Sequence, residues 1–328
     1  MPSDPNPPSR KSRTTRRDFL QASGLAACIG AALPSLTPAA EPTGKTDPLL
    51  PTIKLGPHEV TRLIIGGNPL YGYSHFNKLF SQHMVDWHTP EHVMALLTRC
   101  EEAGLNTWQN SYAERTLEDI DRYRKEGGRM HWLLLGKPDW DKNPSRIDDA
   151  AKRKPIGISC HGALNERLHR AKNFTLLTDL LKRIRDTGVL VGLSAHNPEL
   201  IETAEEKGWD VDYYMCCLYY LTRPPDEFKS ILGNGLPLGE IYLPGDPERM
   251  FKTVRSTKKP CLVYKVLAAG RRVGNKDEIK TCFKVALQNI KPTDAMIVGM
   301  YQKFGDQVGE NAALVRDLCA AKFLQKNG

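Results

Sequence analysis

One stretch of the chain, Gly104 to Tyr112, passes from a helix stop through a short apolar segment into polar side chains. Gly104 is a common residue just past a helix end, and the β-branched and aromatic residues after it favour a strand. Gln109 and Tyr112 then bring an amide and a phenol to the end of that strand. Lys137 and His161 end two later apolar segments in the same way. Parallel barrels carry their chemistry at strand ends of this kind.

The elements that must position these residues alternate between short apolar runs and amphipathic helical patterns from residue 52 to the C-terminus. This alternation is typical of a parallel sheet. We expect strands at 62–66, 106–110, 131–137, 155–161, 189–196, 213–219, 261–267 and 295–300. Eight parallel strands close a (β/α)8 TIM barrel, so the sequence predicts an α/β fold with one barrel domain over residues 53–328.

Two predicted loops are much longer than the usual two to six residues of a strand-to-helix connection. The first spans residues 68–88 and is expected to be a functional lid. The second spans residues 223–259 and has room for an extra helix. If both leave the carboxyl ends of strands, they wall the same site.

Several short motifs, taken in order, resemble the aldo-keto reductases. They are Leu55-Gly56, Ile64 to Gly67, Gly104 to Asn106, Val191 to Ser194, Tyr264 to Leu267 with Gly270, and Val298-Gly299 followed by Glu310-Asn311. The resemblance covers about 270 residues. It implies a (β/α)8 barrel that opens with a β-hairpin and a nicotinamide-dependent oxidoreductase that acts on a carbonyl or sugar-like substrate.

The catalytic set that the resemblance implies is an Asp, a Tyr, a Lys and a His, in which the Tyr protonates the carbonyl. Lys137 and His161 match the family's Lys and His. A cation and an imidazole near the phenol lower its pKa and orient the substrate oxygen. Gln109 stands in place of the Asp. The catalytic set of this chain is therefore altered.

The tyrosine of the set is out of register. Glu114 stands five residues after Gln109, where the family has its Tyr, and Tyr112 takes that role if two residues are deleted from the loop. Tyr71 and Tyr73 on the first long loop are alternatives.

Loss of the carboxylate changes the charge of the site. A unit charge pair about 4 Å apart is worth on the order of 4 kcal/mol at an effective dielectric constant of about 20. Without its partner, Lys137 is expected to have a lowered pKa. The site then favours an anionic substrate or a tyrosinate, or it frees Lys137 as a base or an imine-forming amine.

The resemblance also implies a set of cofactor-binding residues: Ser194, Asn197, Tyr264, Gly270, Lys303 and Asn311. Tyr264 would stack under the nicotinamide. Lys265 replaces the Ser that follows this Tyr in the family. Lys303, Arg271 and Arg272 could bind a 2′-phosphate, which favours NADP over NAD, although exposed basic residues on loops are usually only solvated.

Two other functions compete with the oxidoreductase. His75, His83, His88, His161 and His196 could gather around a metal in an isomerase or lyase barrel, but their spacing matches no standard ligand pattern and we predict no metal site. The second alternative is a barrel that binds a ligand without turnover.

The first 40 residues predict an export signal. Arg16-Arg17 followed by Phe19-Leu20, an apolar run to Leu33 and a small-residue end resemble a twin-arginine (Tat) signal. Residues 41–52 form a linker. The Tat export machinery is then a partner and the periplasm the expected location. Cys28 also lies in a lipoprotein-like cleavage box, although the apolar run continues past it and an incidental cysteine is favoured.

Composition narrows the remaining classes of protein. The chain is 40% hydrophobic and 26% charged, and it has no apolar stretch of the roughly 20 residues that a membrane span needs. Its net charge of +8 falls to +5 once the basic leader is set aside. That mild charge lacks the interleaved aromatic residues of an RNA-binding surface, so we expect a small-molecule substrate and no nucleic acid.

Overall fold

The computed structural model describes residues 47–233 and 237–326, of which 322–326 are described by their backbone alone. The predicted signal peptide, with Cys28, and residues 41–46 of the linker lie outside these residues. All described residues belong to one compact unit.

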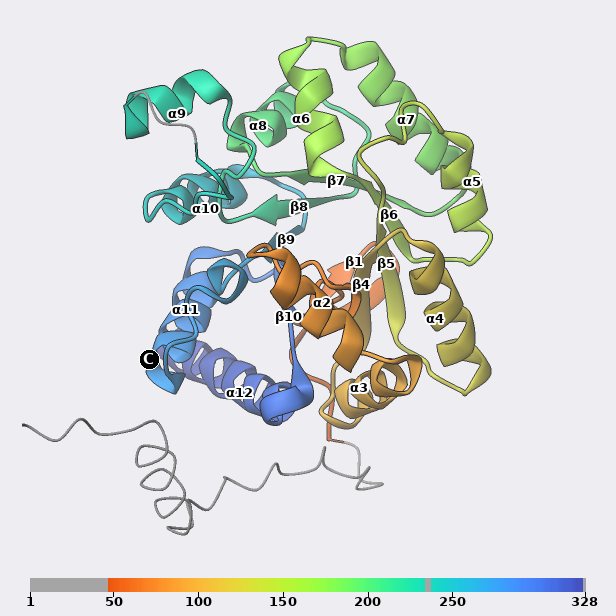
Figure 1. The fold of residues 1–328 in the computed structure, drawn as a ribbon, viewed down its shortest axis with the longest axis vertical. Coiled ribbons are helices and arrows are strands. Elements are labelled where there is room, and N and C mark those ends of the chain that lie inside the picture. Colours follow the sequence, from red (N-terminus) through yellow and green to blue (C-terminus); the bar gives the residue numbers. More distant parts are fainter. Residues whose placement is uncertain (1–46, 234–236, 327–328) are drawn as a thin grey trace, which may run out of the picture. The chain divides into compact units, whose positions relative to one another are not determined.

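Eight parallel strands form a closed barrel in the order β10-β3-β4-β5-β6-β7-β8-β9 (Figure 1). Their bounds are β3 Leu63–Gly66, β4 Thr107–Ser111, β5 His131–Leu135, β6 Gly157–Cys160, β7 Leu190–Ala195, β8 Tyr213–Cys217, β9 Cys261–Tyr264 and β10 Ala295–Gly299. Each strand lies within one residue of its expected start or inside the expected range. The prediction of a (β/α)8 barrel is therefore confirmed.

Helices surround the barrel (Figure 1). They are α2 Lys78–Trp87, α3 Pro90–Glu102, α4 Glu114–Lys125, α5 Ser145–Ala151, α6 Gly162–Arg170, α7 Phe174–Asp186, α8 Pro198–Glu206, α9 Pro225–Leu232, α10 Asp246–Ser256, α11 Lys276–Asn289 and α12 Gln307–Lys326, with 3-10 turns η2 Pro69–Tyr71, η3 Ala268–Gly270 and η4 Gln302–Phe304. Side chains cap several of them. Thr89 accepts a hydrogen bond from the His92 backbone N–H, and Asn173 accepts one from Leu176.

Strand alternation divides the apolar side chains into two cores. Trp108, Trp132 and their outward-facing neighbours pack against the helices. Leu133, Tyr213 and Leu262 face the inside of the barrel and form the second core. All seven described cysteines are buried and free, as expected for small apolar side chains.

A β-hairpin packs against the inner core. Strands β1 Thr52–Leu55 and β2 His58–Thr61 pair antiparallel, and Gly56 makes the turn with φ +56°. Ile53, Leu55 and Val60 belong to the inner core. Because β2 runs directly into the start of β3, the hairpin lies at the amino end of the strands. The resemblance to aldo-keto reductases predicted a hairpin here.

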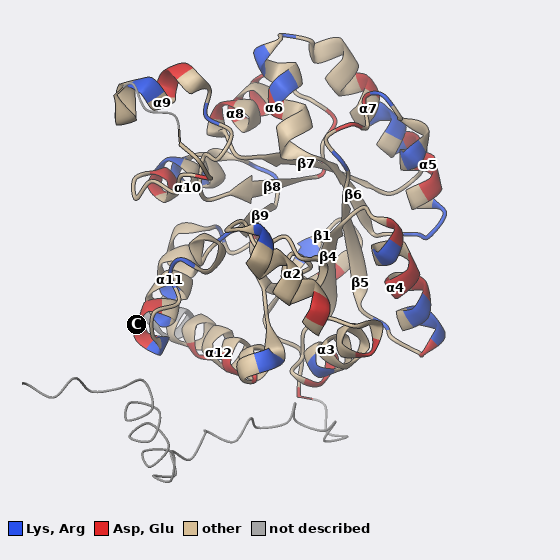
Figure 2. Ribbon diagram, in the orientation of Figure 1, with Lys and Arg blue, Asp and Glu red and all other residues tan. Residues whose placement is uncertain are grey.

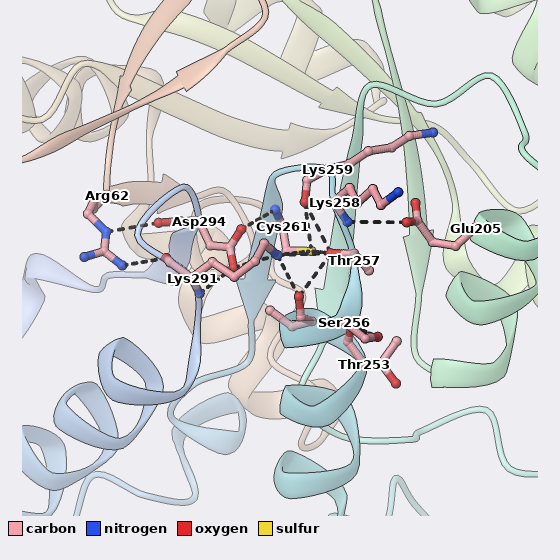
Figure 3. A network of polar contacts seen from close by, with 11 residues as sticks. Arg62, Glu205, Thr253, Ser256, Thr257, Lys258, Lys259, Cys261, Lys291 and Asp294 are labelled. Carbon is pink, nitrogen blue, oxygen red and sulfur yellow. Dashed lines mark hydrogen bonds and ion pairs between the residues drawn. The ribbon is translucent and has the colours of Figure 1, made fainter.

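A buried polar network joins three strand starts at the same amino end (Figure 3). The carboxylate of Asp294 accepts hydrogen bonds from the backbone N–H groups of Cys261 and Lys291, and it lies 3.1 Å from the Lys291 Nζ. Arg62 donates from Nε to the Asp294 carbonyl and from Nη2 to the Lys291 carbonyl. The network ties the starts of β3, β9 and β10 to one another. We assign it a structural role, because residues at the amino end of a barrel contribute to stability, whereas the chemistry lies at the carboxyl end.

Charges of both signs alternate over the outer helices (Figure 2). On α7, Arg185 lies 2.7 Å from Asp210 and 2.7 Å from Asp212. Lys182 on the same helix pairs with Asp186 at 2.6 Å. No helix among residues 47–233 and 237–326 is long and apolar enough to cross a membrane.

Candidate active site at the barrel mouth

Tyr264, the last residue of β9, begins one chain of polar contacts at the carboxyl end of the barrel. Its hydroxyl lies 3.2 Å from the Ser194 Oγ and 3.3 Å from the His196 Nε2, both on or next to β7. The His196 Nδ1 lies 3.5 Å from the Glu166 Oε1 on α6. Burial raises the pKa of Tyr264 well above its ordinary value. The phenol is therefore protonated at neutral pH and can donate a proton.

Glu166 is held by the start of the loop after β7. Its carboxylate accepts hydrogen bonds from the backbone N–H groups of His196 and Asn197, and from the Thr222 hydroxyl. Burial alone would raise the pKa of Glu166, but the hydrogen bonds and charge of His196 and its other donors keep it below the ordinary value. Glu166 is thus a buried carboxylate aimed at an imidazole.

His75 and Lys265 form a second chain with Glu240. The His75 Nδ1 lies 2.8 Å from the Glu240 Oε1, and its Nε2 lies 2.9 Å from the Lys265 Nζ and 3.0 Å from the Asn68 Nδ2. His75 comes from the loop after β3, Glu240 from the loop after β8 and Lys265 from the end of β9. The expectation that the two long loops meet at one site is confirmed by this contact.

The backbone conformation of Lys265 breaks the alternation of side chains between the two faces of β9. Its φ is +62°, in the left-handed region that non-glycine residues rarely adopt. Such strain is concentrated at functional sites. Burial lowers the pKa of Lys265, and the neighbouring charge of Arg271 lowers it further. Among the described residues no carboxylate lies within ion-pair distance of the amine.

His161 follows β6 and caps α6. The Ala163 backbone N–H donates to its Nδ1 at 3.1 Å, so the ring proton of the neutral imidazole is on Nε2. Burial lowers the pKa of His161 to about 4, and the charges of His196 and Lys265 act in the same direction. A neutral imidazole at a helix start donates a hydrogen bond to a carbonyl oxygen without giving up its proton at neutral pH.

Gly162 allows His161 and His196 to approach. A Cβ on Gly162 would lie 2.8 Å from the His196 Nδ1. Any larger residue would push this imidazole away from Tyr264. Glycine is therefore required at the first position of α6 because the His196 imidazole packs directly against it.

Gln109 and Lys137 also reach the mouth, with fewer contacts. Gln109 is 7% exposed and faces the barrel interior, because Trp108 beside it belongs to the outer core. Lys137 lies two residues past the end of β5 and is half-buried. Within the described residues neither side chain has a hydrogen bond or ion pair.

The other candidate tyrosines lie away from the histidines. The Tyr112 ring packs edge-on against Trp140 at 5.7 Å, in the core between barrel and helices. The Tyr71 hydroxyl donates to the Asp119 Oδ2 on α4 at 3.0 Å. Tyr73 is 45% exposed. Of these four tyrosines, Tyr264, expected only to stack on a cofactor, is the one whose hydroxyl the described contacts place beside an imidazole, that of His196.

Of the predicted cofactor residues, the described contacts join only two to each other. Ser194 contacts Tyr264, while Asn197 accepts from the Glu199 backbone N–H and so caps α8. Asn311 is buried on α12, and Gly270 is exposed on η3. Only Ser194 and Tyr264 are joined to each other.

The three cations considered for a 2′-phosphate all have protein partners. Arg271 stacks on Tyr242 with 4.0 Å between the guanidinium carbon and the ring centre, and it donates to the His75 carbonyl. Arg272 bonds Glu278 at 2.5 Å. The Lys303 Nζ lies 5.3 Å from the centre of the Trp87 ring. A phosphate would have to share these cations with their protein partners.

Four of the six groups that build the two chains were missed by sequence reasoning about catalysis. His75 and His196 were considered only as metal ligands, and Glu166 and Glu240 gave no signal because charges on helices and loops are usually solvated. The described residues contain no group of three or more His, Cys, Asp or Glu that could hold a metal ion.

A hollow on the outer wall is separate from these chains. It lies between α3 and α12, where Arg99 pairs with Asp306 at 2.6 Å. Arg316 on α12 donates to the carbonyls of Pro48 and Ala103. This surface anchors the entry of the chain into the barrel.

No protein-family model and no curated protein match this chain. Among solved structures, a truncated 3-deoxy-D-arabino-heptulosonate 7-phosphate synthase from Thermotoga maritima matches with 14% identity, a TM-score of 0.50, and coverage of 86% of this chain and 94% of that one. The apo form of Gox0644 matches at 10% identity and TM-score 0.49, over 81% and 93% of the two chains. An aldo/keto reductase from Brucella melitensis matches at 9% identity and TM-score 0.48, over 84% and 100%. Similarity at these identities concerns the barrel fold and no activity.

Proposed function

We propose that this protein is an exported oxidoreductase that interconverts a carbonyl and a hydroxyl group on a small, sugar-like substrate with a nicotinamide dinucleotide. The ordered motifs that resemble aldo-keto reductases support this proposal, as does the hairpin at the amino end of the barrel. The catalytic set is altered, and its proton donor is Tyr264 instead of Tyr112.

The observation that carries the proposal is the fixed tautomer of His161. Its Nδ1 is occupied by the Ala163 N–H, so its Nε2–H is available to a substrate oxygen. Its pKa of about 4 keeps the ring neutral over the physiological range. A preorganised donor of this kind stabilises the negative charge that develops on a carbonyl oxygen during reduction.

Tyr264 supplies the proton that the new hydroxyl needs. The phenol donates to the substrate oxygen, and His196 stands behind it to return a proton from solvent. Glu166 stabilises the imidazolium that forms when His196 holds that proton. In the oxidation direction the same groups remove the proton from the substrate hydroxyl.

A nicotinamide dinucleotide supplies the hydride when it is bound. Ser194 and Tyr264 fit the nicotinamide end, because they lie together at the ends of β7 and β9. The three cations considered for the adenine end, Arg271, Arg272 and Lys303, all have protein partners. We therefore propose NAD as the better cofactor, against the expectation of NADP from sequence.

Lys137 adds positive charge to the mouth. Its amine has no carboxylate partner among the described residues, because Gln109 replaces the acid that the resemblance implies. An uncompensated cation favours a substrate that carries a carboxylate or phosphate group.

Dinucleotide binding tests the proposal. Tryptophan fluorescence of the purified barrel should be quenched by NADH, and more weakly by NADPH, with Trp87 under Lys303 as a nearby reporter. A Lys303→Ala variant should change NADPH binding by less than twofold if that lysine stays on Trp87. Absence of binding by either dinucleotide at millimolar concentration would end the case for hydride transfer.

Export through the Tat pathway is a further part of the proposal. It rests on the paired Arg16 and Arg17, which lie outside the described residues. A fusion of residues 1–52 to a reporter that works only after folded export should reach the periplasm. Replacement of both arginines by lysine should stop export, and continued export would contradict the Tat assignment.

Two alternatives remain as outcomes of these experiments. For a non-catalytic barrel the Lys137→Met and His161→Ala variants are decisive, because unchanged turnover would remove both residues from any mechanism. A metal-dependent isomerase or lyase predicts stoichiometric metal in protein purified without chelator. The described residues offer no ligand cluster for that metal.

A further inference from the structure

We propose that Lys265 is a nucleophilic amine that forms an imine with a small carbonyl compound, and that His75, backed by Glu240, takes up its proton. This activity goes beyond hydride transfer and needs no dinucleotide. The substrate class, a carbonyl compound, is shared with the proposed function.

The first argument is the direction of the hydrogen bonds around His75. Glu240 can only accept while it is a carboxylate, so the proton on the His75 ring is on Nδ1, 2.8 Å from Oε1. The Nε2 lone pair then faces two donors, the Lys265 Nζ at 2.9 Å and the Asn68 Nδ2 at 3.0 Å. The imidazole is placed to receive a proton from the amine, and Glu240 stabilises the resulting imidazolium.

The second argument is what surrounds the amine. Within the described residues Lys265 has no ion pair, and the imidazole of His75 separates it from Glu240. Arg271 lies on the other side of His75, where it donates to the His75 carbonyl and stacks on Phe76 and Tyr242. Burial is the largest influence on the pKa of this amine and lowers it; Arg271 adds to that effect and the charge of Glu240 opposes it. The pKa lies below its ordinary value, and only the neutral amine is a nucleophile.

The third argument is the placement of Lys265 at the mouth. The left-handed backbone of Lys265, at φ +62°, lets Tyr264 and Lys265 serve one site although they are consecutive. The Lys265 Nζ lies 5.8 Å from the centre of the Tyr264 ring. The charges of Lys265 and His75 both act on His161, so the amine is within electrostatic range of the proposed oxyanion donor. Lys137, the lysine expected from sequence to form an imine, has no such imidazole partner.

The chemical step balances within the site and water. The Nζ lone pair attacks the carbonyl carbon, a C–N bond forms, and the carbonyl oxygen takes a proton from an acid at the mouth. His75 takes the proton that leaves the nitrogen. The carbinolamine then loses its oxygen as water, which leaves a C=N bond and no net oxidation or reduction.

Imine formation and the proposed reduction are separate activities. A hydride delivered to the C=N bond would leave a permanent secondary amine on Lys265 and would end turnover. The imine instead acidifies the C–H bond next to it, which serves bond cleavage or isomerisation of a hydroxy-carbonyl compound. The two proposals can therefore fail independently.

Reductive trapping tests the inference without a cofactor. The purified protein is incubated at neutral pH with pyruvate or glyceraldehyde and sodium cyanoborohydride, and the modified lysines are mapped by mass spectrometry. Lys265 should be labelled at least tenfold faster than the exposed Lys125 and Lys284. Equal or slower labelling of Lys265 in the wild-type protein would overturn the inference, and this readout needs no variant.

Three variants sharpen the result. Lys265→Met should abolish the fast adduct, and the control Lys284→Met, at an exposed lysine of α11, should leave the labelling of Lys265 within twofold of wild type. His75→Gln, which removes the base, should slow labelling of Lys265 by roughly tenfold or more. A wild-type rate in His75→Gln would contradict the role of the imidazole. Circular dichroism of each variant verifies that it is folded.

Comparison with dinucleotide binding separates the two proposals. Fast trapping at Lys265 in a protein that binds neither NADH nor NADPH supports the imine and removes the oxidoreductase. Dinucleotide binding without trapping removes the imine and leaves the oxidoreductase standing.

Discussion

Tyr264 and Lys265 are consecutive residues, yet each ends a separate chain made of an imidazole and a carboxylate. Tyr264 contacts His196, which faces Glu166, and Lys265 contacts His75, which faces Glu240. The left-handed backbone at Lys265 makes this possible, since an extended strand would send the two side chains to opposite faces of the sheet. One strand end thus presents a phenol and an amine, each with its own proton acceptor.

Tyr264→Phe should lower turnover of a carbonyl substrate by roughly 10²–10⁴-fold, because it removes the proton donor and keeps the ring. Tyr112→Phe is the matched control, since the described contacts of Tyr112 are made by its ring. Steady-state kinetics of the two variants decide which tyrosine acts. Loss of activity in Tyr112→Phe with wild-type activity in Tyr264→Phe would reverse the assignment.

Glu166→Gln should reduce turnover and shift its pH dependence, because an amide cannot stabilise a protonated His196. The amide still accepts from the backbone N–H groups of His196 and Asn197, so the loop keeps its hydrogen bonds. The pH–rate profile of the variant should therefore differ in shape from that of the wild type. A profile that keeps the wild-type shape would show that Glu166 has only a structural role.

Asp294→Ala should destabilise the barrel by about 3–5 kcal/mol, because it removes the buried carboxylate that accepts from the backbone N–H groups of Cys261 and Lys291 and pairs with the Lys291 amine. The control is Asp186→Ala, which breaks an exposed pair with Lys182 and should cost less than about 1 kcal/mol. Urea denaturation measures both. Similar midpoints for the two variants would contradict the structural role of the network in Figure 3.

His88 should make the protein less stable in mild acid. Burial lowers its folded pKa to about 4, while in the unfolded chain it titrates near its ordinary value of 6.5. Between those values the unfolded state binds a proton that the folded state does not, so the free energy of unfolding falls as the pH falls from 6.5 towards 4. The loss is about 3 kcal/mol for this one residue.

Urea denaturation at several pH values in wild type and His88→Gln measures that loss. The variant should have a flatter dependence between pH 6.5 and 4 and an unchanged slope at higher pH. Identical slopes in the two proteins would show that His88 is not held neutral. His161, whose pKa is also lowered to about 4, accounts for a further part of the wild-type slope.

Much of the fold follows from local sequence pattern, and the site does not. Strands such as β5 and β7 are continuous apolar runs bounded by turn residues, so the barrel was predictable from their number and spacing. The meeting of the two long loops followed from barrel topology, because both leave carboxyl strand ends. These predictions depend on residues close together in the chain.

The acid–base chains depend on residues far apart in the chain. Glu166 and His196 are 30 residues apart, and His75 and Glu240 are 165 apart, so nothing local marks either carboxylate as a partner of an imidazole. The conformation of Lys265 is likewise set by tertiary structure, since no sequence pattern requires a lysine with positive φ. The expectation for Tyr112 rested on an assumed deletion, and the structure places its ring in the outer core.

The most direct test of the central claim is an assay of NADH oxidation. Wild type and His161→Asn are compared with a panel of aldoses, ketoses and 2-oxo acids. Asn keeps an acceptor for the Ala163 N–H and so retains the cap of α6, but it cannot reproduce the Nε2–H that faces the substrate oxygen. The account predicts that wild type consumes NADH with at least one compound and that His161→Asn loses about 10²-fold or more of that rate with stability little changed. No consumption by the wild type with any compound, or an equal rate in His161→Asn, would contradict it.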